Sequence, residues 1–416
     1  MPIPSPRSWS SLGRPFGYLW SASALTNLGD GILLAAGPLL IASLTSSPAL
    51  VGGAVLIQQL PWLLFALFSG AIADRLDKRR LIVAINVSRA LTMVLLAGFV
   101  ATGSATVLLV YVTLFILGVG ETFADSASSP LVVATVPAEE LGRANARLGL
   151  TFTMGNQLAG PPLGAVLFAF ASAIPLAAQA VTFILGAVLV SRVRLDTAPG
   201  GPARPLVRGV MADVREGLRW LRSHRPLLTL IGAILVMNVA FMTAFATWVL
   251  YSTRLLGLNE FQFGLLVTCS AIGGLAGPLA YGLVKRRVGH AGILRFAFFF
   301  EGGMFLLFAT VPPAWVVAAT MVVFGTHTMV WGTAATTLIQ QTTPKPLLAR
   351  VTSIYAMANI GGSAVGAAIG ATIAELFGLT TGFWVGGALV LIVAVASWRS
   401  VRAIRPADDR TGQSDA

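Results

Sequence analysis

The sequence predicts an all-α integral membrane protein with twelve transmembrane helices in two pseudo-symmetric six-helix bundles. Hydrophobic residues make up 56% of the 416 residues and charged residues only 11%, and the mean hydropathy is +0.82. The charges fall in short loops between apolar runs of about 20 residues, the length that a hydrocarbon layer about 30 Å thick requires. Helices are expected because backbone amides that face lipid must be satisfied within their own segment, and the runs are too long and unbroken for barrel strands.

The apolar runs fall into two groups of six. The first run follows Arg7 and Arg14 and is far longer than the apolar core of a cleavable signal, so it is expected to remain as the first span. The twelve predicted spans are approximately 16–43, 49–72, 81–102, 106–131, 147–170, 173–192, 227–251, 261–284, 291–311, 313–335, 350–375 and 379–399.

The basic residues predict the orientation of these spans. Residues 74–80 carry six charges in seven positions between the second and third apolar runs, which is typical of a cytoplasmic hairpin. The other even-numbered loops and both termini also hold Lys or Arg, whereas the opposite side holds only Arg254. Because Lys and Arg are retained in the cytoplasm, both termini are expected on the cytoplasmic side of the membrane.

An internal repeat divides the chain. We predict an N-terminal half at 1–192, a cytoplasmic linker with an amphipathic helix at 193–226, a C-terminal half at 227–400 and a cytoplasmic tail at 401–416. The linker helix is expected either in the membrane interface or as a plain soluble helix. A shift of 207 residues superposes Gly70 on Gly277, Ala73 on Ala280, Arg79 on Arg286, Arg80 on Arg287, Pro137 on Pro344 and Arg143 on Arg350.

Several functional classes are excluded by what the sequence lacks. Cys269 is the single cysteine, and His224, His290 and His327 are far apart, so neither a disulfide framework nor a metal site is expected. There is no Gly-Lys-Ser/Thr phosphate loop and no nucleophile-elbow or zinc-protease spacing, so we expect neither an enzyme nor a bound cofactor. The net charge of +12 is scattered over many loops, which argues against nucleic acid as a partner.

Three short motifs stand out in and between the predicted spans. Asn27-Leu28-Gly29-Asp30-Gly31 lies in the first span, and Gly160-Pro161-Pro162-x-Gly164 lies in the fifth. The loop between the second and third spans follows the pattern Gly-x-Leu-Ala-Asp-Arg-x-Gly-Arg-Lys-x-x-Leu at Gly70, Ala73, Asp74 and Arg75, with Lys78 and Arg79 at its two basic positions and Leu81 one position before its final Leu. In this loop Ile72 replaces Leu, and Asp77 replaces a glycine that would allow a left-handed turn. These motifs resemble the major facilitator superfamily, and in particular its drug:proton antiporter subgroup of macrolide and siderophore exporters, whose Gly-Pro-x-x-Gly element the second motif partly matches.

This resemblance implies a secondary exporter of the bacterial inner membrane, with many membrane spans, that moves a small amphiphilic molecule outward by alternating access, in exchange for protons. A dedicated siderophore or natural-product exporter and a non-transporting receptor of the same fold are the alternatives. Asp74, with Arg75, Lys78 and Arg79, would act as a cytoplasmic gate latch and Gly70 would allow close approach, unless the loop serves topology alone. The expected partners are a small-molecule substrate, protons and the lipid bilayer, and the expected state is a monomer.

Acids inside the predicted spans are the candidate site residues. An acid at the centre of a lipid-facing helix costs about 2.5–3.5 kcal/mol, so such residues are expected to face a cavity or a partner. Glu121 and Asp125 are four residues apart on one helix face, where both cannot ionise cheaply, which suits proton coupling. Asp125 could instead pair with Arg143 or Arg147. We predict substrate-binding or proton-coupling roles for Asp30, Glu121, Asp125, Glu301 and Asn27.

Overall fold

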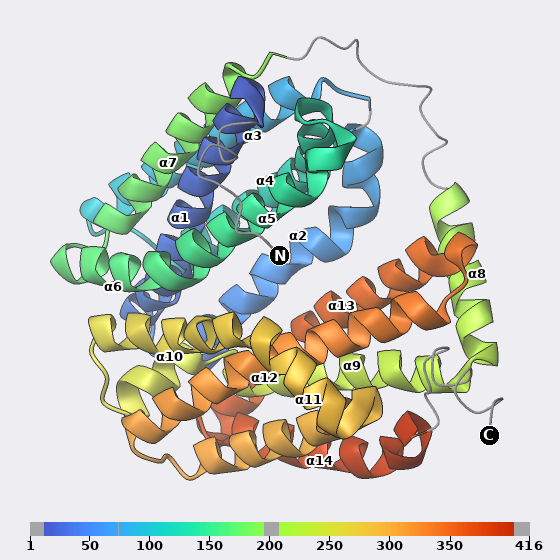
Figure 1. Cartoon of the computed structure of the whole chain (residues 1–416). Coiled ribbons are helices and arrows are strands. Elements are labelled where there is room, and N and C mark those ends of the chain that lie inside the picture. The colour runs from blue at the N-terminus through green and yellow to red at the C-terminus, as the bar shows by residue number, and fades with distance from the viewer. Residues whose placement is uncertain (1–11, 74, 195–207, 403–416) are drawn as a thin grey trace. The chain divides into compact units, whose positions relative to one another are not determined.

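The computed structural model describes residues 12–73, 75–194 and 208–402, and all regular elements in these ranges are helices. The chain divides into two compact units, each described by itself. The first unit comprises 1–44, 64–206 and 260–268, and the second comprises 45–63, 207–259 and 269–416. The start of α2 therefore belongs to the second unit, and the start of α11 belongs to the first (Figure 1).

The helices follow the predicted order along the chain (Figure 1). Up to Ser191 they are α1 (Gly13–Leu44), α2 (Pro48–Ala73), α3 (Lys78–Ala101), α4 (Val107–Thr135), η2 (Ala138–Glu140), α5 (Leu141–Thr151), η3 (Phe152–Ala159), α6 (Gly160–Phe170) and α7 (Ile174–Ser191). After the linker they are α8 (Arg208–Ser223), α9 (Arg225–Phe245), α10 (Trp248–Leu250), η4 (Tyr251–Leu255), α11 (Glu260–Ala309), α12 (Ala314–Thr342), α13 (Lys345–Phe377) and α14 (Thr381–Arg402).

In the described part of the chain, ten segments are long and apolar enough to cross a membrane. The remaining two predicted spans are also helical. The fifth is built from α5, η3 and α6 in succession, and the twelfth is α14, whose apolar part covers Thr381–Ala396. The twelve predicted spans are therefore all present as helical segments.

The eighth predicted loop is shorter in the structure than in the prediction. The sequence predicts that Lys285, Arg286 and Arg287 lie in this loop, but the three residues are helical, and α11 consists of two helices that meet at a kink. The kink lies at Gly289, whose φ of 65° is in the left-handed region that favours glycine. Charged residues with straight side chains are good helix formers, so the first helix continues through them until the glycine ends it.

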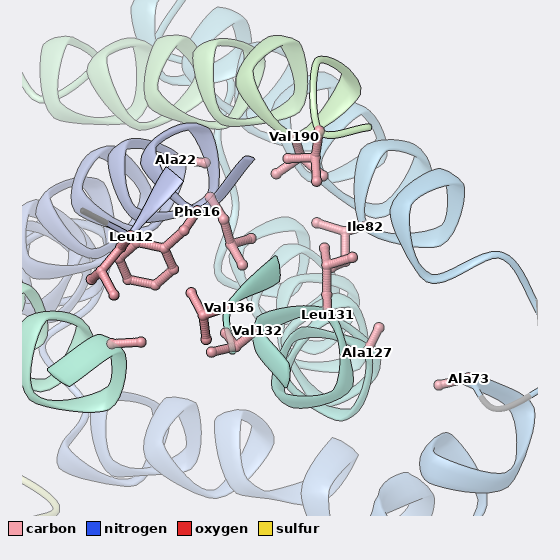
Figure 2. Close-up of a cluster of buried hydrophobic side chains, with 13 residues drawn as sticks. Leu12, Phe16, Ala22, Ala73, Ile82, Ala127, Leu131, Val132, Val136 and Val190 are labelled. Atoms are coloured by element: carbon pink, nitrogen blue, oxygen red, sulfur yellow. The ribbon is translucent and has the colours of Figure 1, made fainter. Parts of the chain in front are cut away.

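A cluster of buried apolar side chains stabilises one end of the first unit (Figure 2). Leu12, directly before α1, and Phe16 of α1 meet Leu131 and Val132 of α4 and Val190 of α7 there. Elsewhere in this unit, α7 packs along both α1 and α3, and α3 packs along α4 (Figure 1). This arrangement brings α1, α3, α4 and α7 together.

The second unit is organised around α9, which packs against α13 and α14 (Figure 1). The small-xxx-small spacing at Gly362, Gly366 and Gly370 explains this contact. A Cβ atom at Gly362 would lie 2.6 Å from the carbonyl oxygen of Leu235, and the other two glycines face carbonyls of α9 in the same way. Glycine therefore lets the two backbones touch, as the spacing predicts.

The linker helix α8 packs against α13 within the second unit. Gly217 faces the side chains of Ile354 and Arg350, and Leu221 is fully buried. The Glu216 carboxylate also forms an ion pair with the Arg350 guanidinium at 2.9 Å. The apolar face of α8 is thus covered at least in part by protein.

Candidate functional site

The candidate site begins with two glycines that flank Asp30 in α1. A Cβ atom on Gly29 would overlap the Thr182 hydroxyl and lie 3.2 Å from Oε1 of Gln179, both in α7. A Cβ atom on Gly31 would lie 2.6 Å from the carbonyl oxygen of Asn156 in η3. The missing side chains allow helices to contact α1 on either side of Asp30.

Asp30 is held by two donors from other helices. Nε2 of Gln179 in α7 donates a hydrogen bond of 2.7 Å to Oδ1 of Asp30. Nη2 of Arg89 in α3 lies 3.4 Å from the same oxygen and forms an ion pair with it. The Arg89 guanidinium also lies 4.1 Å from the centre of the Phe183 ring in α7. A buried charge thus has both an opposite charge and an aromatic face to offset its desolvation.

Glu121 and Asp125 of α4 belong to the same electrostatic group. Glu121 interacts with the charges of Asp30, Arg89 and Asp125, and Asp125 interacts with those of Arg89 and Asp30. Both carboxylates are exposed, although many protein atoms surround them. The first unit therefore brings three of the four predicted acids together around one arginine, and two of those acids remain open to solvent.

The other predicted site residues lie apart from this group. The side-chain amide of Asn27 donates to the Ser23 carbonyl at 2.8 Å and to the Ser23 hydroxyl at 3.0 Å, one turn earlier in α1. Glu301 lies in the second unit with only 7% of its surface exposed, and its Oε2 atom has no hydrogen-bond partner. Arg143, considered as a partner for Asp125, is paired with Glu140 at 2.7 Å.

The loop motif forms a helix start rather than a left-handed turn. Asp77 has a φ of −63° and caps α3, with its side chain accepting a hydrogen bond of 2.9 Å from the Arg80 amide. The capping carboxylate explains why aspartate can stand where the related motif has glycine. Arg79 donates to the Val193 carbonyl, just beyond the end of α7, at 3.0 Å.

The remaining residues of the loop motif are Gly70, Arg75, Lys78 and Asp74. No atom lies within 4 Å of a Cβ atom built on Gly70, so the described residues make no close contact that requires glycine there. Arg75 is exposed, and Lys78 is the first residue of α3. Asp74, the predicted latch residue, lies outside the described residues.

The Gly-Pro-Pro-x-Gly element joins α6 to α1. Pro161 and Pro162 lack backbone N–H groups, which interrupts the hydrogen-bond ladder, and the π-helical η3 ends directly before Gly160. A Cβ atom on Gly160 would lie 2.5 Å from Cα of Gly31, and one on Gly164 would overlap the Ile32 carbonyl oxygen. The element therefore sets the packing of the helix that carries Asp30.

Two residues of the site escaped sequence reasoning. Gln179 stands out as an uncharged polar residue in an apolar run, which is a weak signal for a partner of Asp30. Arg89 is charged and lies in the third predicted span, yet its position close to a cytoplasmic end gave no reason to connect it with Asp30. Among the described residues, His, Cys, Asp and Glu form no group of three that could hold a metal ion.

Apolar helices of membrane-spanning length, with a buried arginine beside acids of which two are exposed, are typical of a polytopic membrane transporter. The chain belongs to the Major Facilitator Superfamily, whose family model matches residues 19–359 and 256–415.

Three relatives in sequence are named as exporters or efflux proteins. The enterobactin exporter EntS of Citrobacter koseri is 26% identical over 368 residues, covering 85% of this chain and 84% of its own. The multidrug efflux pump Tap of Mycolicibacterium fortuitum is 26% identical over 395 residues, covering 90% of this chain and 93% of its own. The macrolide efflux protein A of Streptococcus pyogenes is 22% identical, covering 91% and 94%.

Solved structures support the fold. A bacterial homologue of the iron transporter ferroportin, in an inward-facing state, has a TM-score of 0.75 at 16% identity and covers 93% of this chain and 98% of its own. A D-xylose–proton symporter has a TM-score of 0.68 at 12% identity and covers 93% and 97%.

Proposed function

We propose that this transporter exports a small amphiphilic molecule across a bacterial inner membrane by alternating access, in exchange for protons. The observation that carries the proposal is the group of Asp30, Glu121 and Asp125 around Arg89. Arg89 is already paired with Asp30 at 3.4 Å, whereas Glu121 and Asp125 are open to solvent. The exporter relatives support the direction of transport.

The geometry suggests a division of roles among these acids. Asp30 is held by Gln179 and Arg89, so it serves as the fixed member that positions the arginine. Glu121 and Asp125 lie on one face of α4 and repel each other when both are charged. A proton or a positively charged cargo would relieve that repulsion, so the two would compete for the same carboxylates. Such competition is what exchange of one for the other requires.

Dedicated export of a siderophore is the second candidate, because the relatives include enterobactin exporters. An anionic siderophore would need an arginine or lysine available in the cavity. Within the described first unit, the positive charge of the acid group comes from Arg89, which Asp30 already engages. We therefore favour neutral or cationic cargo.

Transport in inside-out vesicles tests this proposal. The chain is expressed in an efflux-deficient bacterium, and a pH-sensitive dye reports proton release while macrolides, cationic dyes and siderophores are added in turn. Wild-type protein is expected to release protons with a macrolide or a cationic dye. Glu121→Gln and Asp30→Asn are expected to abolish that signal, because each removes a member of the acid group.

Glu139→Gln is the matched control, because Glu139 is an exposed acid in η2, away from the predicted spans. It is expected to behave as wild type. Proton release driven only by siderophores would favour the second candidate. Cargo uptake with no proton release would overturn proton exchange, and the absence of any response from folded protein would overturn export of these compounds.

A further inference from the structure

A pocket with two arginines and a largely apolar wall lies in the first unit at the beginning of α1. Its volume is about 460 Å³. It is formed by the first turns of α1, by Arg147 of α5 and by Leu189 near the end of α7. The sequence predicts that α1 and α5 begin, and α7 ends, on the cytoplasmic side. The pocket therefore lies where the inner leaflet's headgroups meet the first span.

The pocket has a positive character. Arg14 and Arg147 both line it, and among the described residues no aspartate or glutamate lines it. The N-terminal turn of α1 adds the partial positive charge of unpaired backbone amides. Two guanidinium groups that line one pocket near a helix start can bind a phosphate group, because guanidinium binds phosphate through paired hydrogen bonds.

The remaining lining residues suit a lipid. Leu12 and Phe16 are buried in the apolar cluster of Figure 2, so the inner wall of the pocket is hydrocarbon. Tyr18 and Trp20 also line it, and Trp20 is 40% exposed. Aromatic side chains with one polar end concentrate at the level of lipid headgroups. A soluble anion would use the arginines but would leave this apolar and aromatic wall without a role.

We propose that this pocket binds the phosphate of an anionic phospholipid headgroup from the cytoplasmic leaflet, with Arg14 and Arg147 as its ligands and Trp20 beside the acyl chain. Pockets lined by basic residues between membrane helices bind acidic headgroups through the same chemistry. The site lies apart from the acid group around Arg89 and does not depend on the proposed transport reaction.

Trp20 provides a direct probe of occupancy. The full-length protein is placed in phosphatidylcholine nanodiscs, and brominated phosphatidylglycerol or brominated phosphatidylcholine is introduced at equal mole fractions. The chain has nine tryptophans, so the Trp20 contribution is the difference in quenching between wild type and Trp20→Phe. Brominated phosphatidylglycerol is expected to quench this contribution at lower mole fraction than brominated phosphatidylcholine does.

Removing the arginines identifies the ligands. In the double variant Arg14→Gln/Arg147→Gln the preference for phosphatidylglycerol is expected to vanish. The apparent affinity for phosphatidylglycerol should fall about fivefold for each arginine removed, because a basic side chain near an anionic surface contributes about 1 kcal/mol. Arg286→Gln/Arg287→Gln is the control, because it removes the same charge from exposed positions outside the pocket. If the double variant does not fold, Arg14→Gln alone is used, because Arg14 is exposed.

Two outcomes would overturn the proposal. Equal quenching by the two brominated lipids in wild type would show that the pocket does not select an anionic headgroup. Displacement of the phosphatidylglycerol signal by millimolar inorganic phosphate would assign the site to a soluble phosphate compound instead. A preference that survives phosphate and the control variant, but is lost without Arg14 and Arg147, supports the lipid assignment.

Discussion

At the scale of single residues, Asp30 and Arg89 form an ion pair in which each charge depends on the other. Arg89 is almost fully buried and lies between the Asp30 carboxylate and the Phe183 ring. Its Nε atom has no hydrogen-bond partner, so Asp30, the Phe183 ring and the nearby charges of Glu121 and Asp125 stabilise it. A buried charge in this position depends strongly on its opposite charge.

Removing one member of this pair is therefore expected to be worse than removing both. Arg89→Leu should destabilise the protein by about 3–5 kcal/mol, because it leaves Asp30 without its opposite charge. The double variant Asp30→Asn/Arg89→Leu should recover much of that stability but no proton-coupled transport. Thermal unfolding in detergent is measured for the two single variants and the double variant. The comparison gives the interaction free energy between Asp30 and Arg89. If the losses of stability in the two single variants add up to the loss in the double variant, the two residues do not stabilise each other.

Gln179 is expected to matter through its hydrogen bond to Asp30. Gln179→Leu keeps the size of the side chain and removes a donor to a charged group, which is worth about 1.5–3 kcal/mol. Transport should slow by about tenfold, the factor equivalent to 1.4 kcal/mol, while the protein remains folded. Vesicle uptake rates measure the change.

Thr182→Val is the matched control for Gln179→Leu. Thr182 lies one turn further along α7, and its hydroxyl donates to the Gln179 carbonyl rather than to Asp30. Valine has nearly the same shape, so transport should change little. If both variants slow transport equally, packing against Gly29 rather than the hydrogen bond explains the effect.

Sequence reasoning found the acids of this site but not their neighbours. A carboxylate in an apolar span is conspicuous because it is expensive there, so Asp30, Glu121 and Asp125 could be selected without a structure. A neutral amide such as Gln179 costs less and draws less attention. Which faces of α1, α3, α4 and α7 meet depends on helix rotation, which the sequence pattern of a uniformly apolar helix does not specify.

At the scale of helices, the glycines on α1 and α6 determine how closely the elements around the site approach. Gly164→Val is expected to destabilise the protein by about 1–3 kcal/mol, because added atoms would press against the α1 backbone at Ile32. Gly98→Val in α3 is the control, because no atom lies within 4 Å of its Cβ position. Melting temperature in detergent distinguishes them, and equal losses would show that helix propensity rather than packing is responsible.

A second feature at this scale is a clamp on the start of α2, formed by Glu375 and Arg254. The Glu375 carboxylate of α13 accepts hydrogen bonds from the Ser47 hydroxyl at 2.7 Å and from the Ala49 amide at 2.9 Å. Arg254 of η4 donates to the Ser46 carbonyl at 3.0 Å. These contacts lie within the second unit and supply a cap to α2 from a distant part of the chain.

The clamp predicts a local change in dynamics. Glu375→Ala should increase amide hydrogen exchange over 48–52 severalfold, because the first turn of α2 loses its cap. Glu375→Gln keeps an acceptor oxygen and should show a smaller increase. Exchange that is unchanged in Glu375→Ala would mean that Ser47 and the remaining turn suffice to hold the helix start.

Helix boundaries were the least predictable feature at this scale. The apolar runs marked each span because the bilayer fixes their length, but charged residues at 285–287 continue a helix as readily as they form a loop. The π-helical η3 follows from the missing N–H groups of Pro161 and Pro162, yet its extent depends on packing against Gly31 and could not be read from the prolines alone.

At the scale of the whole molecule, two arginines that the predicted internal repeat superposes make different contacts. Arg143 pairs with Glu140 three residues earlier, whereas Arg350, which matches it in the repeat, pairs with Glu216 of the linker helix α8. The same position thus stabilises a local turn in the first unit and anchors the linker in the second. A repeat in sequence therefore predicts equivalent helices better than equivalent contacts.

The orientation of the whole chain is the remaining prediction from sequence. Basic residues at the termini and in the even-numbered loops place those segments in the cytoplasm, which puts the loop at Ser104 outside. Cys269 is the single native cysteine, so Cys269→Ser provides a background without reactive thiols. Ser104→Cys and Arg286→Cys then introduce one thiol each at exposed positions on the two predicted sides.

A membrane-impermeant maleimide applied to intact cells reads the orientation directly. Ser104→Cys should be labelled in intact cells, and Arg286→Cys should be labelled only after the membrane is opened. The opposite pattern would invert the topology and would place the arginine-lined pocket of α1 at the outer leaflet, because Arg14 and Arg147 lie on the same predicted side as Arg286. Labelling of both positions in intact cells would contradict the predicted spans between them. The expected result has an electrostatic reason. Moving an arginine-rich loop outward across the membrane costs free energy, and the loops on the predicted outer side, which carry only Arg254, incur much less of this cost.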